Sequence, residues 1–252
     1  MILPSDQLIQ DTEGFHSVMK DALKVATETE GLVTVGIKPS WACPSYGYVE
    51  RGSPTDLAGL KLTHQPHEVV RFREKPDPER AAEYLASGNF TWNAGMFIWS
   101  VPAVLRELGA HAAELRDFVE ELRDSSDLPG TVTSRFPSLT PISIDYALME
   151  KAENIVMAKG TFPWDDVGSW TALSNHFAPD SGGNIVIGSM EAVASRDNIV
   201  FSRDRTTAMI GVKDLIVVQA EGVTLICPKD RAQDIKGLLQ QIRENPEHHD
   251  IV

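Results

Sequence analysis

The chain has few cysteines, no long apolar run and a deficit of positive charge, and each shortage narrows the class of protein. Its 252 residues include only Cys43 and Cys227, which lack metal-ligand spacing. We therefore expect free thiols in a reducing compartment, with a disulfide between them as the weaker alternative. No apolar stretch approaches membrane-spanning length, and MILPSDQLIQ at the start does not resemble a signal peptide. These absences predict a cytoplasmic protein that does not associate with a membrane.

The charge balance argues against nucleic acid as a partner. The chain has 23 Lys and Arg against 36 Asp and Glu, a formal net charge of −13. An acidic surface repels nucleic acid and anionic membranes, but a small phosphate ligand responds to the local field of its own pocket. Hydrophobic residues make up 42% and charged residues 23%, as in ordinary globular proteins. The length allows one large domain or two smaller ones.

The first two thirds of the chain have an α/β pattern. Apolar residues at helical spacing predict a helix over residues 13–29 that ends at Gly31, and a β-branched run predicts a buried strand over 32–37. A strand, a helix and a further strand indicate an α/β fold with a parallel sheet. The remaining predicted elements are strands at 46–52, 68–74 and 96–100, helices at 78–87, 102–108, 111–124 and 143–152, and a loop at 125–141.

The pattern changes after residue 178. PDSGG is typical of a linker, and short β-like runs follow it. NIVIGS (184–189) and NIVFS (198–202) repeat each other, which suggests a stacked β-coil. A helix is predicted near 231–243. We place a domain boundary near 178–183, giving domains at 1–178 and 183–252.

Two stretches place charged side chains directly after predicted strands. In LPSDQ, Asp6 follows an apolar strand end, and ligands of open α/β sheets bind at the carboxyl ends of strands. The alternative is a solvated turn or a helix cap. In REKPDP, Lys75 could meet a phosphate and Glu74 could bind sugar hydroxyls. The alternative there is a surface ion pair at a strand–helix turn.

Two further stretches combine tryptophans with polar side chains. In TWNAGMFIW, Asn93 lies between a tryptophan and a tight glycine turn, where it could recognise a hydroxyl or cap its own turn. In FPWDDVGSW, Asp165 and Asp166 have aromatic neighbours, which is consistent with a bound hard cation such as Mg²⁺. Alternatively, these acids cap a helix that starts near Gly168, a role that suits Asp165 better than both together.

In order, these stretches resemble the mannose-1-phosphate guanylyltransferases, a branch of the sugar-phosphate nucleotidyltransferases. The resemblance runs from residue 2 to about 173 and is carried by LPSDQ, YGYVERG, FREKPD, WNAGMFIW, SIDYALMEK and WDDVGSW. It implies a partial Rossmann-like nucleotidyltransferase sheet with helices on both faces, followed by a small β-rich, β-helix-like region.

The resemblance also implies a reaction and a metal site. The phosphate of mannose 1-phosphate would attack the α-phosphorus of GTP, giving GDP-mannose and pyrophosphate. The protein would mainly position two anions and neutralise the developing charge. By resemblance, Asp6 and Asp166 hold Mg²⁺, with Asp165 as the outer acid, and Lys75 binds the sugar phosphate.

By the same resemblance, a further set of residues contacts the hexose. Glu74, Asn93 and the backbone at Gly47 would hold the sugar, while Asp145 and Lys151 in SIDYALMEK would support the site.

The sequence departs from the family pattern at its beginning. The family opens with a glycine-rich GGxGxRL loop that wraps the triphosphate, whereas the Gly-Gly pair here is Gly182-Gly183, with no arginine in register. Gln7 replaces the usual histidine of LPADH. We expect a truncated start, a separate chain for the nucleotide half, or a non-catalytic sugar-phosphate-binding module. Exposed apolar edges would favour a homo-oligomer.

Overall fold

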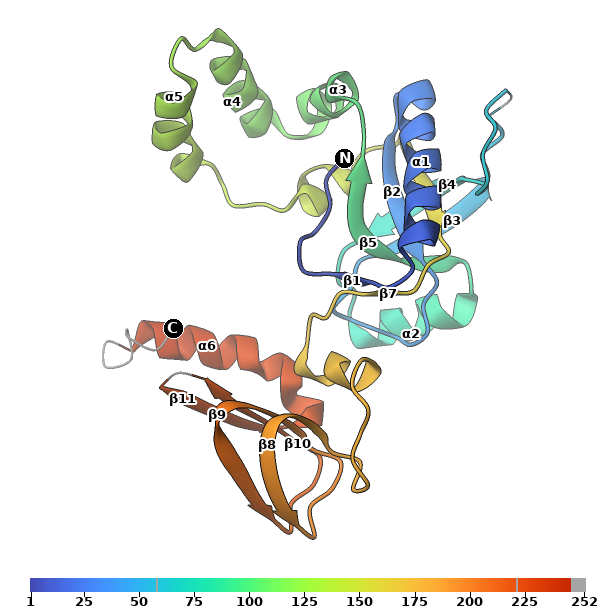
Figure 1. Ribbon diagram of the computed structural model, residues 1–252. Coiled ribbons are helices and arrows are strands. Elements are labelled where there is room, and N and C mark those ends of the chain that lie inside the picture. Colours follow the sequence, from blue (N-terminus) through green and yellow to red (C-terminus); the bar gives the residue numbers. More distant parts are fainter. Residues whose placement is uncertain (58, 221, 246–252) are drawn as a thin grey trace. The chain divides into compact units, whose positions relative to one another are not determined.

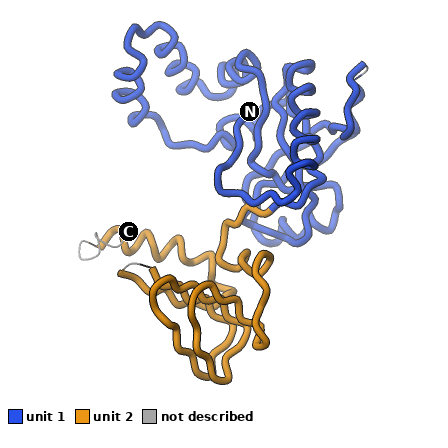
Figure 2. The backbone as a smooth tube through the Cα atoms, viewed as in Figure 1, with its two compact units in different colours: residues 1–164 blue, residues 165–252 orange. Residues whose placement is uncertain are grey.

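The computed structural model describes residues 1–57, 59–220 and 222–245. It divides the chain into two compact units, residues 1–164 and 165–252, which are drawn in separate colours in Figure 2. Each unit is described by itself. Within the described ranges, no helix is both long enough and apolar enough to cross a lipid bilayer.

The first unit is built on a five-stranded sheet that closes into a barrel. Its strands are β2 (Leu32–Ile37), β3 (Tyr48–Pro54), β4 (His67–Arg73), β5 (Phe90–Ile98) and β6 (Ile155–Gly160), in the order β2-β5-β3-β4-β6. Strands β2 and β6 are parallel and the other pairings are antiparallel, so the sheet is mixed and not the parallel sheet that the strand–helix–strand pattern predicts. The short strands β1 (Leu8–Ile9) and β7 (Trp164–Asp165) lie outside this sheet.

Seven helical segments accompany the sheet in the described part of the unit (Figure 1). They are α1 (Thr12–Thr29), α2 (Pro78–Ser87), α3 (Val101–His111), α4 (Ala113–Asp124), α5 (Leu128–Arg135), the 3₁₀ turn η1 (Phe136–Ser138) and the π-helix η2 (Asp145–Met149). Asp11 caps α1, and the helix ends at Glu30 in the left-handed conformation (φ 50°) instead of at Gly31. Asp77 and Gly88 bound α2 as predicted.

Two further sequence-based predictions in this unit were wrong, and a third was right in predicting a helix but not its type. The segment 125–141, expected as a loop, contains α5, because Asp127 caps the helix and a proline opens it. Strand β5 begins at Phe90, so Asn93 lies inside a strand and not in a turn before one. The helix expected at 143–152 is the π-helix η2, which proves important for the site.

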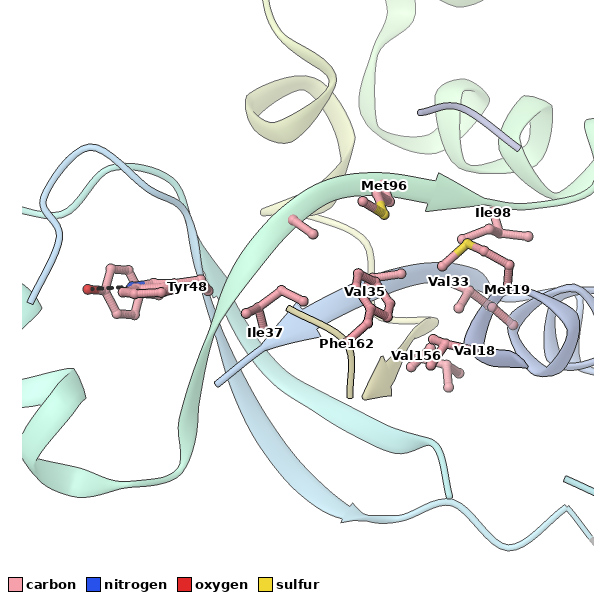
Figure 3. Packing of buried hydrophobic residues seen from close by; sticks show 14 of the residues in the cluster. Val18, Met19, Val33, Val35, Ile37, Tyr48, Met96, Ile98, Val156 and Phe162 are labelled. Atoms are coloured by element: carbon pink, nitrogen blue, oxygen red, sulfur yellow. Dashed lines mark hydrogen bonds between the residues drawn. The ribbon is translucent and has the colours of Figure 1, made fainter. Parts of the chain in front are cut away.

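The core lies on both faces of the sheet because successive side chains of a strand point to opposite faces. Val33 and Val35 pack in one cluster with Val18 and Met19 of α1 (Figure 3), while Leu32 joins a second cluster with η2 and α3. Helices therefore cover both faces.

The second unit is built on a four-stranded sheet. Its elements are the 3₁₀ helix η3 (Trp170–Asn175), β8 (Ile185–Val193), β9 (Ile199–Ile210), β10 (Leu215–Ala220), β11 (Val223–Pro228), the 3₁₀ helix η4 (Lys229–Asp234) and α6 (Ile235–Glu244). The strand order is β11-β10-β9-β8, and β8, β9 and β10 pair in parallel, so Ile185, Ile199 and Ile216 stack in register. Asn184 Oδ1 accepts the backbone and side-chain N–H groups of Asn198, at 3.0 and 2.9 Å. The repeat of NIV thus marks successive coils, as predicted.

Candidate functional site

The site is centred on a strained corner at the end of β4. Glu74 and Lys75 follow the last strand residue, and Lys75 has a left-handed backbone (φ 46°). A left-handed conformation is costly for a residue with a Cβ, and such strain concentrates at functional sites. Lys75 Nζ lies 2.9 Å from Glu74 Oε1; the Glu74 side chain is 8% exposed and that of Lys75 is 56% exposed. The corner thus joins a buried carboxylate to an accessible ammonium group.

Asn93 of β5 has a fixed amide orientation beside this corner. Its Oδ1 accepts hydrogen bonds from Thr34 Oγ1 at 2.9 Å and from the Gly95 backbone N–H at 3.1 Å. Its Nδ2 donates to Asp145 Oδ1 at 3.2 Å. Asn93 therefore connects the sheet to the first residue of η2.

Gly47 lies next to Glu74 and Asn93, and its lack of a side chain leaves room for them. Its carbonyl accepts the Asn93 backbone N–H at 2.8 Å. A Cβ at Gly47 would lie 2.4 Å from Glu74 Oε2 and 3.3 Å from Asn93 Cβ. A larger residue would displace the Glu74 carboxylate, so glycine keeps this space open. The structure thus brings together Gly47, Glu74, Lys75, Asn93 and Asp145.

Burial sets the electrostatics of this cluster. Burial raises the pKa of Glu74 above its ordinary value, against the lowering effect of its hydrogen bond from Lys75. Burial likewise raises the pKa of Asp145. The hydrogen bond to Glu74 raises the pKa of Lys75. Two partly desolvated carboxylates beside one ammonium group suit a ligand that offers both hydroxyl donors and an anionic group.

Lys151 lies apart from the cluster. Its Nζ donates to the carbonyl of His111, at the end of α3, at 3.4 Å. The structure records no contact between Lys151 and the Glu74 corner in the described residues, so its supporting role stays a prediction. The preceding residue, Glu150, does contact the corner: its Oε1 accepts the backbone N–H of Glu74 at 2.9 Å. Sequence reasoning missed Glu150, although SIDYALMEK contains it.

The segment that carries Asp6 lies against β5. Gln7 Nε2 donates to the carbonyl of Ala94 at 2.7 Å, and Trp164 Nε1 donates to Gln7 Oε1 at 2.8 Å. Gln7, which departs from the family pattern, therefore braces this segment next to Asn93. The Asp6 side chain is exposed, and the structure gives it no hydrogen bond or ion pair within the described ranges. This state fits the solvated-turn alternative as well as a cation ligand, so the metal role of Asp6 stays a prediction.

In the second unit, Asp165 is already fully engaged. Its carboxylate accepts from the Val167 backbone N–H (2.8 Å), Asn175 Nδ2 (3.0 Å) and His176 Nε2 (2.9 Å). Burial alone would raise its pKa, but these hydrogen bonds outweigh burial and lower it. Asp165 therefore holds together its own loop and η3.

Asp166 makes a similar local turn. Its Oδ1 accepts the Gly168 backbone N–H at 3.1 Å, and a Cβ at Gly168 would lie 2.4 Å from Asp166 Oδ2. Both acids thus accept backbone N–H groups two residues on. Neither caps a helix at Gly168, because η3 begins later, after Ser169. Local turns fix both carboxylates.

The pairing of Asp6 with Asp166 around a metal ion stays a prediction. Asp6 belongs to the first unit and Asp166 to the second. In residues 1–57, 59–220 and 222–245, no group of three or more His, Cys, Asp or Glu side chains is arranged to hold a metal ion. A site with two protein carboxylates would need phosphate or water oxygens to complete it.

Comparison with known proteins identifies the family. The nucleotidyl transferase family matches residues 1–181, and a MannoseP isomerase/GMP-like beta-helix domain matches residues 188–242. The chain belongs to the nucleotidyl transferase family: it has an α/β nucleotidyltransferase core followed by a β-rich, β-helix-like region. Nucleotidyl transferases generally use a divalent metal ion.

Individual relatives narrow the comparison. A mannose-1-phosphate guanylyltransferase of Escherichia coli is 34% identical over 249 residues, covering 97% of this chain and 52% of the relative. The alginate biosynthesis protein AlgA of Pseudomonas aeruginosa is 32% identical and is covered over 50% of its length. This chain therefore spans about half the length of these curated relatives. A crystal structure described as mannose-1-phosphate geranyltransferase from Thermus thermophilus superposes with a TM-score of 0.81 at 30% identity, covering 96% of this chain and 68% of that one.

Proposed function

We propose that this chain binds mannose 1-phosphate as part of an enzyme that forms GDP-mannose and pyrophosphate from mannose 1-phosphate and GTP. The observation that carries the proposal is the convergence of Glu74, Asn93 and Asp145 on the space beside Gly47, with Lys75 at its rim. The names of the relatives supply the substrate class.

Each group has a role that its position supports. The carboxylates of Glu74 and Asp145 accept hydrogen bonds from sugar hydroxyls, and the fixed amide of Asn93 orients the ring. The Lys75 side chain is 56% exposed, so its ammonium group can turn from Glu74 toward the sugar phosphate and offset the phosphate charge. The main contribution of these residues is to position one phosphate oxygen for attack on the α-phosphorus of the nucleotide.

A divalent ion, Mg²⁺ in this proposal, would neutralise the nucleotide phosphates, with Asp6 and Asp166 as its carboxylate ligands. The proposed location is the cytoplasm. Calorimetry on a protein in which the GGxGxRL loop precedes these 252 residues can test the metal role without turnover. There Asp6→Asn and Asp166→Asn should each remove the Mg²⁺-dependent part of nucleotide binding. Normal GDP-mannose formation by Asp166→Asn would contradict that role.

The sugar-phosphate site is tested by titrating the 252-residue chain with mannose 1-phosphate. Lys75→Ala should weaken binding by at least about tenfold, because the phosphate loses a charge-assisted partner. Lys159→Ala removes the same charge from an exposed position on β6 and should bind like the unchanged chain. Equal binding by both variants would contradict the assignment of Lys75.

A non-catalytic sugar-phosphate-binding module is the second outcome of the same experiment. Such a module would bind mannose 1-phosphate, ignore GTP and produce no GDP-mannose. Because the GGxGxRL loop is absent from these 252 residues, the discriminating GTP titration and turnover assay use a protein in which that loop precedes them. The enzyme then binds GTP and forms GDP-mannose, whereas the binding module does neither.

A further inference from the structure

The π-helix η2 presents two acidic side chains to the Glu74 corner. Asp145, at its start, accepts the Asn93 amide, and Glu150, directly after it, accepts the Glu74 backbone N–H. The turn between them is closed by the Glu150 N–H, which donates to the Asp145 carbonyl at 2.9 Å. This hydrogen bond spans five residues, the pattern of a π-turn.

The π-turn explains why both acids face the same site. In an α-helix, five residues rotate by about 500°, which would leave the two side chains about 140° apart around the axis. The wider turn brings them to one side, where each contacts a different part of the cluster. The π-turn contains one residue more than an α-helical turn, and this extra residue places both acids on the same side, as π-bulges at functional sites often do.

We propose that Glu150 is a positioning residue that holds the Glu74–Lys75 corner, and thereby the Lys75 ammonium group, in place for the sugar phosphate. The inference rests on the proposed function and adds Glu150 to the residues that serve it. The Glu150 carboxylate accepts the hydrogen bond of the Glu74 N–H, just beyond the last residue of β4. The next residue, Lys75, has the left-handed backbone, which persists only where surrounding contacts fix it. Glu150 is such a contact, and it needs no contact with the ligand.

Three substitutions at Glu150 separate geometry from charge in the full chain. Glu150→Gln keeps an acceptor oxygen at the same reach, so mannose 1-phosphate binding should stay within about threefold of the unchanged chain. Glu150→Asp keeps the charge, but its side chain is one methylene shorter and the oxygen no longer reaches the Glu74 N–H. Glu150→Ala removes the carboxylate altogether. Both should weaken binding by at least about tenfold, the effect of losing a hydrogen bond to a charged group. Glu153→Ala, an exposed acid three residues on, is the matched control.

Amide exchange at Glu74 provides a readout that does not depend on the ligand. Its N–H should exchange faster in Glu150→Ala and Glu150→Asp than in Glu150→Gln or Glu153→Ala. Binding by Glu150→Asp equal to that of Glu150→Gln would overturn the inference, as would unchanged Glu74 exchange in Glu150→Asp. If Glu150→Ala does not fold, the comparison of Asp with Gln decides alone. If the unchanged chain binds no mannose 1-phosphate, the proposed function fails, while Glu74 exchange still tests the corner.

Discussion

Two sets of buried carboxylates in the first unit differ in how completely they are satisfied. Asp21, on α1 and 4% exposed, accepts the backbone N–H groups of Thr63 and His64 at 2.7 and 2.9 Å, His64 Nδ1 at 3.2 Å and Lys24 Nζ at 3.3 Å. These hydrogen bonds outweigh burial and lower its pKa. At the Glu74 corner, burial dominates and raises the pKa of both acids.

The contrast separates Asp21, a structural acid, from Glu74 and Asp145, which we propose to be binding acids. Asp21 has a donor for nearly every lone pair and fastens the segment before β4 to α1. Glu74 accepts from Lys75, and Asp145 accepts from its own backbone N–H, Ser143 and Asn93, but desolvation outweighs these hydrogen bonds at both carboxylates. Such residues cost stability in the free protein and gain partners when a hydroxylated ligand binds. An acid whose desolvation outweighs its hydrogen bonds is therefore a stronger sign of a site than a buried acid as such.

The largest effect is expected from Asp21→Ala. It leaves the backbone N–H groups of Thr63 and His64 without their acceptor, which should destabilise the first unit by about 3 kcal/mol. The melting temperature should fall by about 6–12 °C in a thermal scan. Glu28→Ala, an exposed acid on the same helix, should change stability by less than about 0.5 kcal/mol. Equal losses of stability in Asp21→Ala and Glu28→Ala would contradict the structural role of Asp21.

A smaller effect of opposite sign is expected from Asp145→Asn. The amide keeps an oxygen that can accept from Asn93 Nδ2 but carries no charge to desolvate. We expect a gain of about 1 kcal/mol, or about 2–4 °C in melting temperature, together with weaker mannose 1-phosphate binding. Asp124→Asn removes a charge from a side chain that is 77% exposed and serves as the control. A lower melting temperature for Asp145→Asn would show that its charge stabilises the free protein.

Local signals predicted much of the fold. Asp77 and Gly88 bounded α2 because a cap and a left-handed glycine act within one turn, and the repeated NIV predicted the parallel stacking of β8 on β9. The polar composition of residues 125–141 predicts a loop, although Asp127, two residues before Pro129, is a start signal for a helix. The strand containing Asn93 was set too short because its pairing with β2 and β3 is a long-range contact.

The site was less accessible to sequence reasoning than the fold. Glu74, Lys75 and Asn93 could be named from strand ends and turn chemistry, but their joint role came from the family resemblance. The contacts of Glu150 and Gln7 could not be predicted, because each side chain binds a backbone group far along the chain: the Glu74 N–H and the Ala94 carbonyl. Nothing local in a sequence marks a side chain whose partner is a distant backbone group.

The pH dependence of stability gives the most sensitive comparison of Asp21 with Asp145. The pKa of Asp21 is lowered on folding, so its stabilising contribution is complete above the unfolded value of about 3.9 and is lost as pH falls through the folded pKa. The pKa of Asp145 is raised, so the advantage of Asp145→Asn over the unchanged chain is complete above the folded pKa. That advantage shrinks to nothing as pH falls toward about 3.9.

The two stability differences should therefore change in separate pH windows and with opposite signs. Denaturant unfolding of the unchanged chain, Asp21→Asn and Asp145→Asn, from neutral pH down to about pH 3, measures both differences. On acidification the Asp145→Asn advantage should fade first, while the Asp21→Asn deficit should persist until below about pH 4. If the Asp21 deficit faded first, Asp145 would be the better satisfied acid. The Glu74 corner would then lose its distinction as the place where a ligand supplies the missing donors.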